Sequence, residues 1–131
     1  MNRFIIADLH LGHEKVALAR GFTSVEDHDE CITDNWNSTV NKHSSVFVLG
    51  DIVFGQSNLS KLARLNGTKK LVLGNHDKYP IRNYLPYFSQ IYGSVRFKEC
   101  VLTHIPVHES QLTRYKKNIH GHLHSKVVTK I

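Results

Sequence analysis

The residues of this chain that could do chemistry are mainly histidines and aspartates in short, repeated patterns. The chain has ten histidines among 131 residues, against one methionine and one tryptophan. Asp8 and His10 are separated by one residue, as are His122 and His124, and in an extended backbone this spacing points both side chains to the same side. Carboxylate oxygen and imidazole nitrogen together suit divalent transition metals such as Mn, Fe, Co, Ni or Zn. The pattern therefore indicates metal binding, although either pair alone also occurs on surfaces that bind no metal.

Five polar groups of this kind follow one another along the chain. They are Asp8-x-His10, Gly50-Asp51, Gly74-Asn75-His76-Asp77, His104 and Gly121-His122-x-His124. Four of them come directly after short apolar runs typical of buried strands, which are Phe4 to Ala7, Val46 to Leu49, Leu71 to Leu73 and Cys100 to Thr103. Because open α/β sheets build their sites outside the carboxyl ends of their strands, the groups are expected to meet at one edge of a sheet.

Helices are predicted between the apolar runs. Apolar residues recur every four positions at Ile32, Trp36 and Val40, so a helix is expected from about Ser24 to Asn41. Thr23 and Glu26 have the spacing of a capping box at its start. A shorter helix is expected over Asn58 to Leu65, where three leucines share a face. Strands and helices in this alternation predict an α/β fold.

The stretch after Tyr79 is harder to assign because Pro80 and Pro86 break helices. Gln90 to Lys98 is a candidate arm of a hairpin, and Lys126 to Ile131 is expected to form a last strand. The aromatic residues of this region could pack a core or stack a base, and they are Tyr79, Tyr84, Tyr87, Phe88 and Tyr92.

Taken in order, the five polar groups resemble the motifs of the calcineurin-like metallophosphoesterase superfamily. Those motifs are D-x-H, G-D-x-x-D, G-N-H-[DE], a lone histidine and G-H-x-H, and the match runs from Asp8 to His124. The opening Asp8-Leu9-His10-Leu11-Gly12-His13 is also similar to small bacterial and bacteriophage members without added domains. The resemblance implies one domain over residues 1–131 with two facing β-sheets flanked by helices, in a minimal or C-terminally truncated form of that fold.

The resemblance also implies the ligands of two divalent metal ions. Asp51 would bridge the ions, whose other ligands would be Asp8, His10 and His124 for the first and Asn75, His104 and His122 for the second. A bridging carboxylate offsets the repulsion between cations roughly 3.5–4 Å apart. Two aspartates leave such a centre net positive, which suits a phosphate ester. Mn is the favoured metal, with Ni, Fe, Co and Zn as alternatives.

The function that the resemblance implies is hydrolysis of a phosphodiester, or of a phosphomonoester, by in-line attack of a hydroxide that bridges the metals. His76 would be the catalytic residue that protonates or stabilises the departing oxygen. Many relatives carry a second aspartate three positions after the bridging one, where this chain has Phe54. Because that aspartate orients the catalytic histidine in the family, either another group orients His76 here, with Asp77 and a backbone carbonyl as the candidates, or His76 acts without strong orientation. The alternative is a catalytically silent scaffold of the same fold, although such scaffolds tend to lose their ligands.

The remaining histidines are weaker candidates for the site. His13, His108 and His120 lie close to ligand positions in the sequence and are candidate substrate contacts. His28 and His43 are expected on the surface.

The composition favours a single cytoplasmic domain. Seventeen Lys and Arg against eleven Asp and Glu give a net charge of +6, which favours anionic partners such as phosphate esters, nucleotides or nucleic acid. The two cysteines, Cys31 and Cys100, suggest no disulfide framework. No apolar stretch approaches the ~20 residues that span a bilayer, so no membrane segment is expected. The substrate and the oligomeric state are left open.

Overall fold

The structure is a computed structural model that describes residues 2–123. Its main sheet contains four parallel strands in spatial order, which are β1 (Arg3–Ile6), β2 (Ser45–Val48), β3 (Thr68–Val72) and β4 (Gln90–Tyr92). The second sheet contains β5 (Val95–Phe97), β6 (Cys100–Thr103) and β7 (Lys117–His120). In this sheet β6 pairs antiparallel with β5 and parallel with β7. The chain is therefore mixed α/β with two sheets.

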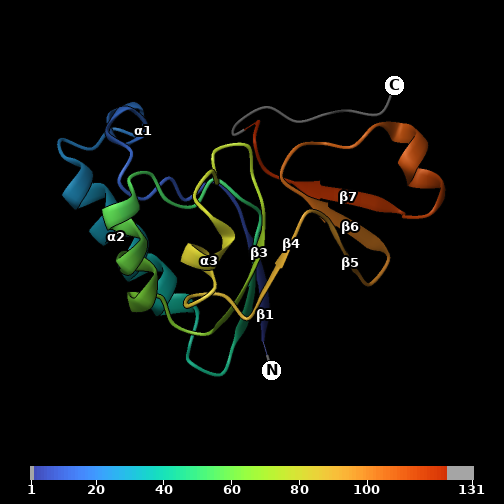
Figure 1. The fold of residues 1–131 in the computed structure, drawn as a ribbon, viewed down its shortest axis with the longest axis horizontal. Helices are drawn as coiled ribbons and strands as arrows, with labels where there is room; N and C mark the ends of the chain where they lie inside the picture. Colours follow the sequence, from blue (N-terminus) through green and yellow to red (C-terminus); the bar gives the residue numbers. More distant parts are fainter. Residues whose placement is uncertain (1, 124–131) are drawn as a thin grey trace.

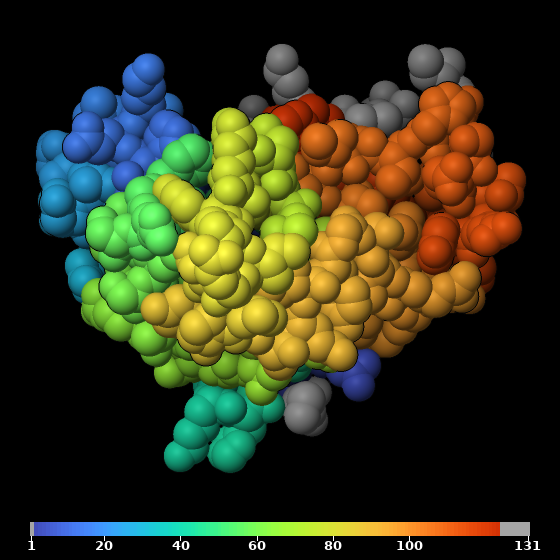
Figure 2. Space-filling view, viewed as in Figure 1, coloured from blue at the N-terminus to red at the C-terminus, as the bar shows by residue number. Residues whose placement is uncertain are grey.

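The helical segments are α1 (Glu14–Ala19), α2 (Val25–Thr39), α3 (Ile81–Tyr84) and two 3₁₀ helices, η1 (Gln56–Arg64) and η2 (Glu109–Thr113). Figure 1 shows α2, η1 and α3 together on one side of the main sheet, whereas η2 lies beyond the second sheet, between β6 and β7. Figure 2 shows the same side of the molecule with its side chains. The residues around α3 fill the centre of this view, with the N-terminal helices on one side and the second sheet on the other. Within residues 2–123, no helix has the length and apolar character needed to cross a membrane.

Two apolar clusters hold these layers together. The larger one lies between the main sheet and the helices, where Val46 and Val48 of β2 pack with Trp36 of α2. The smaller one lies between the two sheets, where Phe47 of β2 packs with Leu102 of β6. Because successive side chains of a strand point to opposite faces, β2 is buried on both sides. The second sheet and the helices thus fix the main sheet from its two faces.

The strongest sequence predictions of secondary structure are confirmed. The four apolar runs form β1, β2, β3 and β6, and the helix expected over 24–41 is α2. The predicted capping box is wrong by one residue. Ser24 is the N-cap, with extended backbone, and its hydroxyl accepts a hydrogen bond from the amide of Asp27 at 3.1 Å. Thr23 instead donates to the carboxylate of Asp27.

Two other expectations need correction, and one strand was missed. The helix expected over 58–65 is the 3₁₀ helix η1, in which the amide of Asn58 bonds to the carbonyl of Gly55, three residues before it. The hairpin arm expected over 90–98 divides between the sheets, because β4 pairs with β3 whereas β5 forms a hairpin with β6. Strand β7 was not predicted, since Ile119 is its one apolar residue. The strand expected over 126–131 lies outside the described residues.

The aromatic residues after β3 pack a core. Tyr84 and Phe88 are buried in the cluster under the helices, and Tyr79 and Tyr87 pack against them. Tyr92 packs against the cluster between the sheets. A base-stacking role for this group is therefore wrong for Tyr84 and Phe88, which as residues are 0% and 4% exposed.

Trp36 ties α2 to the segment after η1, and its removal is expected to destabilise the fold. The ring is 4% exposed, and its indole N–H donates to the carbonyl of Asn66 at 2.9 Å. We expect Trp36→Ala to lower the free energy of unfolding by about 3–5 kcal/mol, because it opens a cavity in the core. Urea denaturation followed by circular dichroism measures this change. The control is Leu18→Ala on α1, where Leu18 is 65% exposed. A loss in Trp36→Ala as small as that in the control would contradict the prediction.

Candidate metal centre

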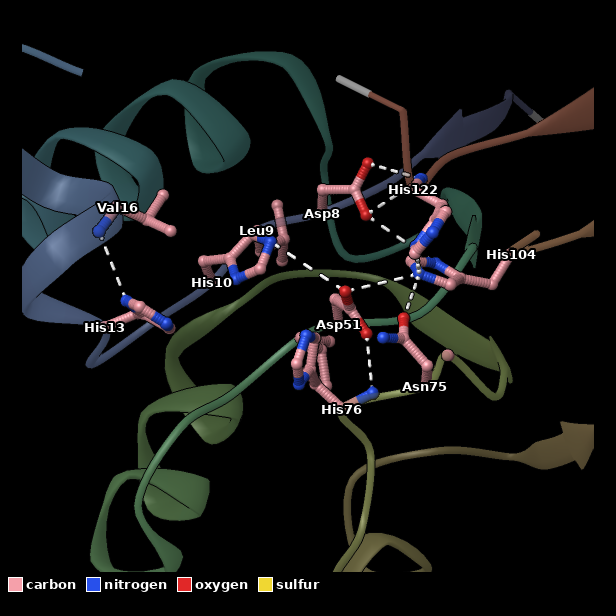
Figure 3. A network of polar contacts seen from close by, with 12 residues as sticks. Asp8, Leu9, His10, His13, Val16, Asp51, Asn75, His76, His104 and His122 are labelled. Atoms are coloured by element: carbon pink, nitrogen blue, oxygen red, sulfur yellow. Dashed lines mark hydrogen bonds and ion pairs between the residues drawn. The ribbon is translucent and has the colours of Figure 1, made fainter. Parts of the chain in front are cut away.

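The polar groups that follow the strands meet at the carboxyl-terminal edge of the two sheets (Figure 3). Six of the seven predicted metal ligands come together there from the segments after β1, β2, β3, β6 and β7, and they are Asp8, His10, Asp51, Asn75, His104 and His122. The seventh, His124, lies outside the described residues. The site therefore gathers side chains from both sheets.

The ligand atoms form two groups that share one residue. Asp8, His10 and Asp51 offer atoms that all lie within 4.8 Å of one another, and Asp51, His104 and His122 do the same. The Oδ2 atom of Asp51 lies 3.9 Å from His10 Nε2 and 3.2 Å from His104 Nε2. Both aspartates are buried, with Asp8 7% and Asp51 3% exposed. Asp51 thus has the position that a carboxylate shared by two cations requires.

The ring of His104 is fixed in one orientation and one tautomer. Its Nδ1 lies 2.7 Å from the carbonyl oxygen of Leu49, and because a carbonyl only accepts, Nδ1 carries the hydrogen. In the neutral ring Nε2 then holds a lone pair, which faces Asn75 Oδ1 at 2.9 Å, Asp51 Oδ2 at 3.2 Å and His122 Nδ1 at 3.3 Å. Such electron-rich atoms converge around a cation or a proton. Metal-ligating histidines donate their second ring N–H to a carbonyl in the same manner.

The pKa values of Asp51 and His104 are shifted in opposite directions by their contact. Burial alone would lower the pKa of His104, but the bonds that the protonated ring donates to Asp51 and to the Leu49 carbonyl raise it above its usual value. Burial alone would raise the pKa of Asp51, but hydrogen bonds from the protonated form of His104 and from the amide of His76 lower it. A positive charge between these groups is therefore stabilised.

The backbone is left-handed at the candidate ligands. Among residues 2–123, five residues other than glycine have φ in this range, and four of them are Asp8 (+57°), His10 (+52°), Asp51 (+49°) and His122 (+70°). Such conformations are unfavourable for residues with a Cβ atom, and they persist where surrounding structure enforces them, often at functional sites. Among the described residues, left-handed backbone is therefore concentrated at the candidate metal ligands.

Hydrogen bonds between the loops maintain these conformations. The carboxylate of Asp8 accepts the amide of His122 at 3.0 and 3.2 Å, and the carboxylate of Asp51 accepts the amide of His76 at 2.9 Å. Asp77 accepts three backbone amides, at 2.7 to 3.1 Å, from the loops after β2 and β3. The carboxylate of Asp77 therefore holds the two loops together, and its role in orienting the ring of His76 stays a prediction.

Aromatic and imidazole rings lie beside the ring of His76. Its side chain is exposed, and its ring centroid lies 5.2 Å from that of Phe54 and 6.5 Å from that of His10. Phe54 also stacks on His10, with centroids 5.3 Å apart, and meets His13 edge to face at 4.1 Å. Phe54 therefore packs among three imidazole rings and restricts the ring of His76 by contact.

The other histidines have mostly structural positions. His13 and His108 are the N-caps of α1 and η2, and each accepts a hydrogen bond from a backbone amide of the first turn. Nδ1 of His120 lies 2.9 Å from the carbonyl oxygen of Gly121. His43 is exposed, as predicted. The prediction for His28 is wrong, because that side chain is 0% exposed and hydrogen-bonded inside the protein.

Sequence comparison finds phage and archaeal relatives. The Gene 66 protein of Mycobacterium phage D29 is 30% identical over 161 residues, which cover 97% of this chain and 80% of that protein. The uncharacterized protein MJ1445 of Methanocaldococcus jannaschii is 30% identical over 129 residues, which cover 93% of this chain and 69% of that protein. The Gene 66 protein of Mycobacterium phage L5 is 37% identical over 82 residues, 58% of this chain and 40% of that protein. No model of a protein family matches the chain.

A solved structure shares the fold. The protein of unknown function AQ665 from Aquifex aeolicus superimposes with a TM-score of 0.64 and 25% sequence identity, over 86% of this chain and 67% of that one. The names of these proteins state no activity. The function of this chain therefore has to be argued from its site.

Gly74 tests the position of Asp51. A Cβ atom at residue 74 would lie 2.5 Å from Asp51 Oδ1 and 2.7 Å from the Asp51 amide nitrogen. We expect Gly74→Ala to displace the carboxylate and to weaken Mn²⁺ binding at least ~10-fold, the usual effect of disturbing the support of a metal ligand. Isothermal titration of metal-free protein with MnCl₂ measures the affinity. Gly93→Ala is the matched control, because nothing lies within 4 Å of a Cβ there. Equal affinities of the two variants would contradict the expected role of Asp51.

Proposed function

This chain belongs to the family of the Gene 66 protein of Mycobacterium phage D29 and of archaeal MJ1445. From the geometry of its site we propose that it is a metal-dependent phosphoesterase of the calcineurin-like metallophosphoesterase superfamily. One observation carries the proposal, which is that two groups of metal-type ligands share the buried carboxylate of Asp51. The order of the motifs and the position of the groups at the ends of strands support it.

The donor set fits two divalent cations. The first would be held by Asp8, His10 and Asp51, with His124 added by the resemblance, and the second by Asp51, Asn75, His104 and His122. Oxygen and imidazole donors without a thiolate suit Mn, and also Ni, Fe, Co and Zn. When bound, such a pair polarises a phosphoryl oxygen and makes water a nucleophile near neutral pH.

The charges and exposure of the chain's own residues favour a phosphate ester as substrate. Asp8 and Asp51 are the acidic residues of the described ligand set, so two divalent cations leave the site net positive. A phosphate anion complements that charge. Asn75 and His76 are exposed, which leaves this side of the site open to a substrate with groups on both sides of phosphorus. We therefore favour a phosphodiester over a phosphomonoester.

His76 is the proposed general acid. Hydrolysis adds water to phosphorus and breaks the bond between phosphorus and the ester oxygen, so the departing alkoxide needs a proton. We assign that proton to the ring of His76, which belongs to the same loop as the ligand Asn75 and is exposed. Its amide binds Asp51 and its ring packs against Phe54, which together limit the positions that the ring can take.

Two variants separate metal binding from proton transfer. Asp51→Asn removes the shared charge, so we expect loss of Mn²⁺ and of activity together. His76→Ala removes no proposed ligand, so Mn²⁺ binding should stay near that of the wild type while kcat falls by roughly 10²–10⁴, the usual contribution of a positioned acid. Titration with MnCl₂ and hydrolysis of phosphodiesters measure the two effects. His43→Ala, which changes an exposed histidine, is the control and should retain full activity.

The leaving group tests the role of His76 more sharply. A p-nitrophenolate group leaves with little protonation, so His76→Ala should lose less activity on a p-nitrophenyl ester than on an ester that leaves as an alkoxide. Equal losses on both substrates would exclude proton transfer by His76. A wild-type protein that binds no Mn²⁺ and hydrolyses neither diesters nor monoesters would favour the scaffold alternative instead.

A further inference from the structure

A second polar cluster lies beside the candidate metal centre and contains none of its ligands. It consists of Arg20 at the end of α1, His28 and Asp29 in α2, and Lys61 in η1. The side chains of His28 and Asp29 are buried, with 0% and 4% of each residue exposed. We refer to these four residues as the backing network.

Arg20 binds the backbone at the start of the loop that carries Asp8 and His10. Its Nη2 donates to the carbonyl of Asp8 at 2.7 Å, and its Nη1 donates to the carbonyl of Leu9 at 3.0 Å. The same Nη1 lies 2.9 Å from Nε2 of His28. Because a guanidinium has no acceptor, His28 Nε2 must accept this bond, and its ring is neutral with the hydrogen on Nδ1.

Asp29 binds the end of the same loop. His28 Nδ1 donates to Asp29 Oδ1 at 2.8 Å, and the amide of Gly12 donates to both oxygens of Asp29 at 3.0 and 3.1 Å. The ammonium of Lys61 pairs with Oδ2 of the same carboxylate, which balances its buried charge. An unbroken series of hydrogen bonds therefore links the first and last residues of the loop 8–12.

We propose that the backing network is the positioning device of the metal-binding loop, and this inference rests on the proposed function. Asp8 and His10 both have left-handed backbone, which is unfavourable unless other bonds enforce it. Bonds from Arg20 and to Asp29 fix the loop at both ends. The network thereby keeps both ligands directed at Asp51 before metal arrives, so it sets the affinity for metal without touching metal or substrate.

The chain offers a matched control for the buried carboxylate of Asp29. Its neighbour Glu30 pairs with Arg64 and so also joins α2 to η1, but this ion pair is exposed and bonds to no part of the loop. Asp29→Asn and Glu30→Gln each remove one carboxylate charge and one ion pair between the same two elements. They differ in whether the lost charge supports the loop.

The test compares Arg20→Lys, Asp29→Asn and Glu30→Gln by titration of metal-free protein with MnCl₂ and by hydrogen exchange of the Leu11 and Gly12 amides. We expect the first two variants to weaken Mn²⁺ binding about 10-fold or more and to speed exchange of these amides, while the third matches the wild type. Circular dichroism verifies that each variant folds. If Asp29→Asn does not fold, His28→Asn replaces it, since an asparagine can still donate to Asp29 but loses the bond with Arg20.

Each outcome bears on the inference. Unchanged Mn²⁺ affinity in folded Arg20→Lys and Asp29→Asn overturns it, and so does an equal loss in Glu30→Gln, because the effect would then reflect the general packing of α2 on η1. If the wild type binds no Mn²⁺, the proposed function fails, and hydrogen exchange of the Leu11 and Gly12 amides then tests whether the backing network positions the loop. Faster exchange in Asp29→Asn than in Glu30→Gln then supports positioning of the loop, and equal exchange overturns it.

Discussion

The buried carboxylate of Asp51 is the interaction on which the rest of the site depends. A charge with only 3% of its residue exposed requires partners from the surrounding structure. The partners here are the amide of His76 and the ring of His104, which come from the loops after β3 and β6. Asp51 itself follows Gly50, whose added Cβ would lie 2.6 Å from Gly74. The loops after β2 and β3 therefore approach each other through two glycines, and the carboxylate occupies the position that this approach creates.

The hydrogen bond between His104 and Leu49 connects this local geometry to the fold. Leu49 follows β2 in the main sheet and His104 follows β6 in the second sheet, so the bond joins the ends of the two sheets. It also determines which nitrogen of His104 faces Asp51. The apolar cluster between the sheets, which includes Phe47 and Leu102, fixes the distance across which the bond forms. Packing of the core and chemistry of the site are therefore coupled through one imidazole ring.

Much of this arrangement could be predicted from the sequence because buried parallel strands appear as continuous apolar runs. The polar groups after β1, β2, β3 and β6 were assigned to one sheet edge on that basis, and the structure brings them together. Strand β7 gave no such signal, since one face of this short edge strand carries its only apolar side chain, Ile119. His28, which is expected on the surface, lies among charged residues of α2. Its burial depends on Arg20, eight positions earlier, and no local pattern shows that contact.

The buried polar residues of the described chain are concentrated around the candidate metal centre. Ten polar or charged residues are buried, and six of them belong to the candidate metal centre or the backing network, namely Asp8, His10, His28, Asp29, Asp51 and His104. Buried polar groups lower stability unless hydrogen bonds compensate them, and the left-handed backbone at the ligands adds further strain. A fold selected for stability alone would place apolar residues at these positions. Under the proposed function, bound cations would add positive charge beside the carboxylates of Asp8 and Asp51, so metal binding should stabilise the same loops that the backing network positions.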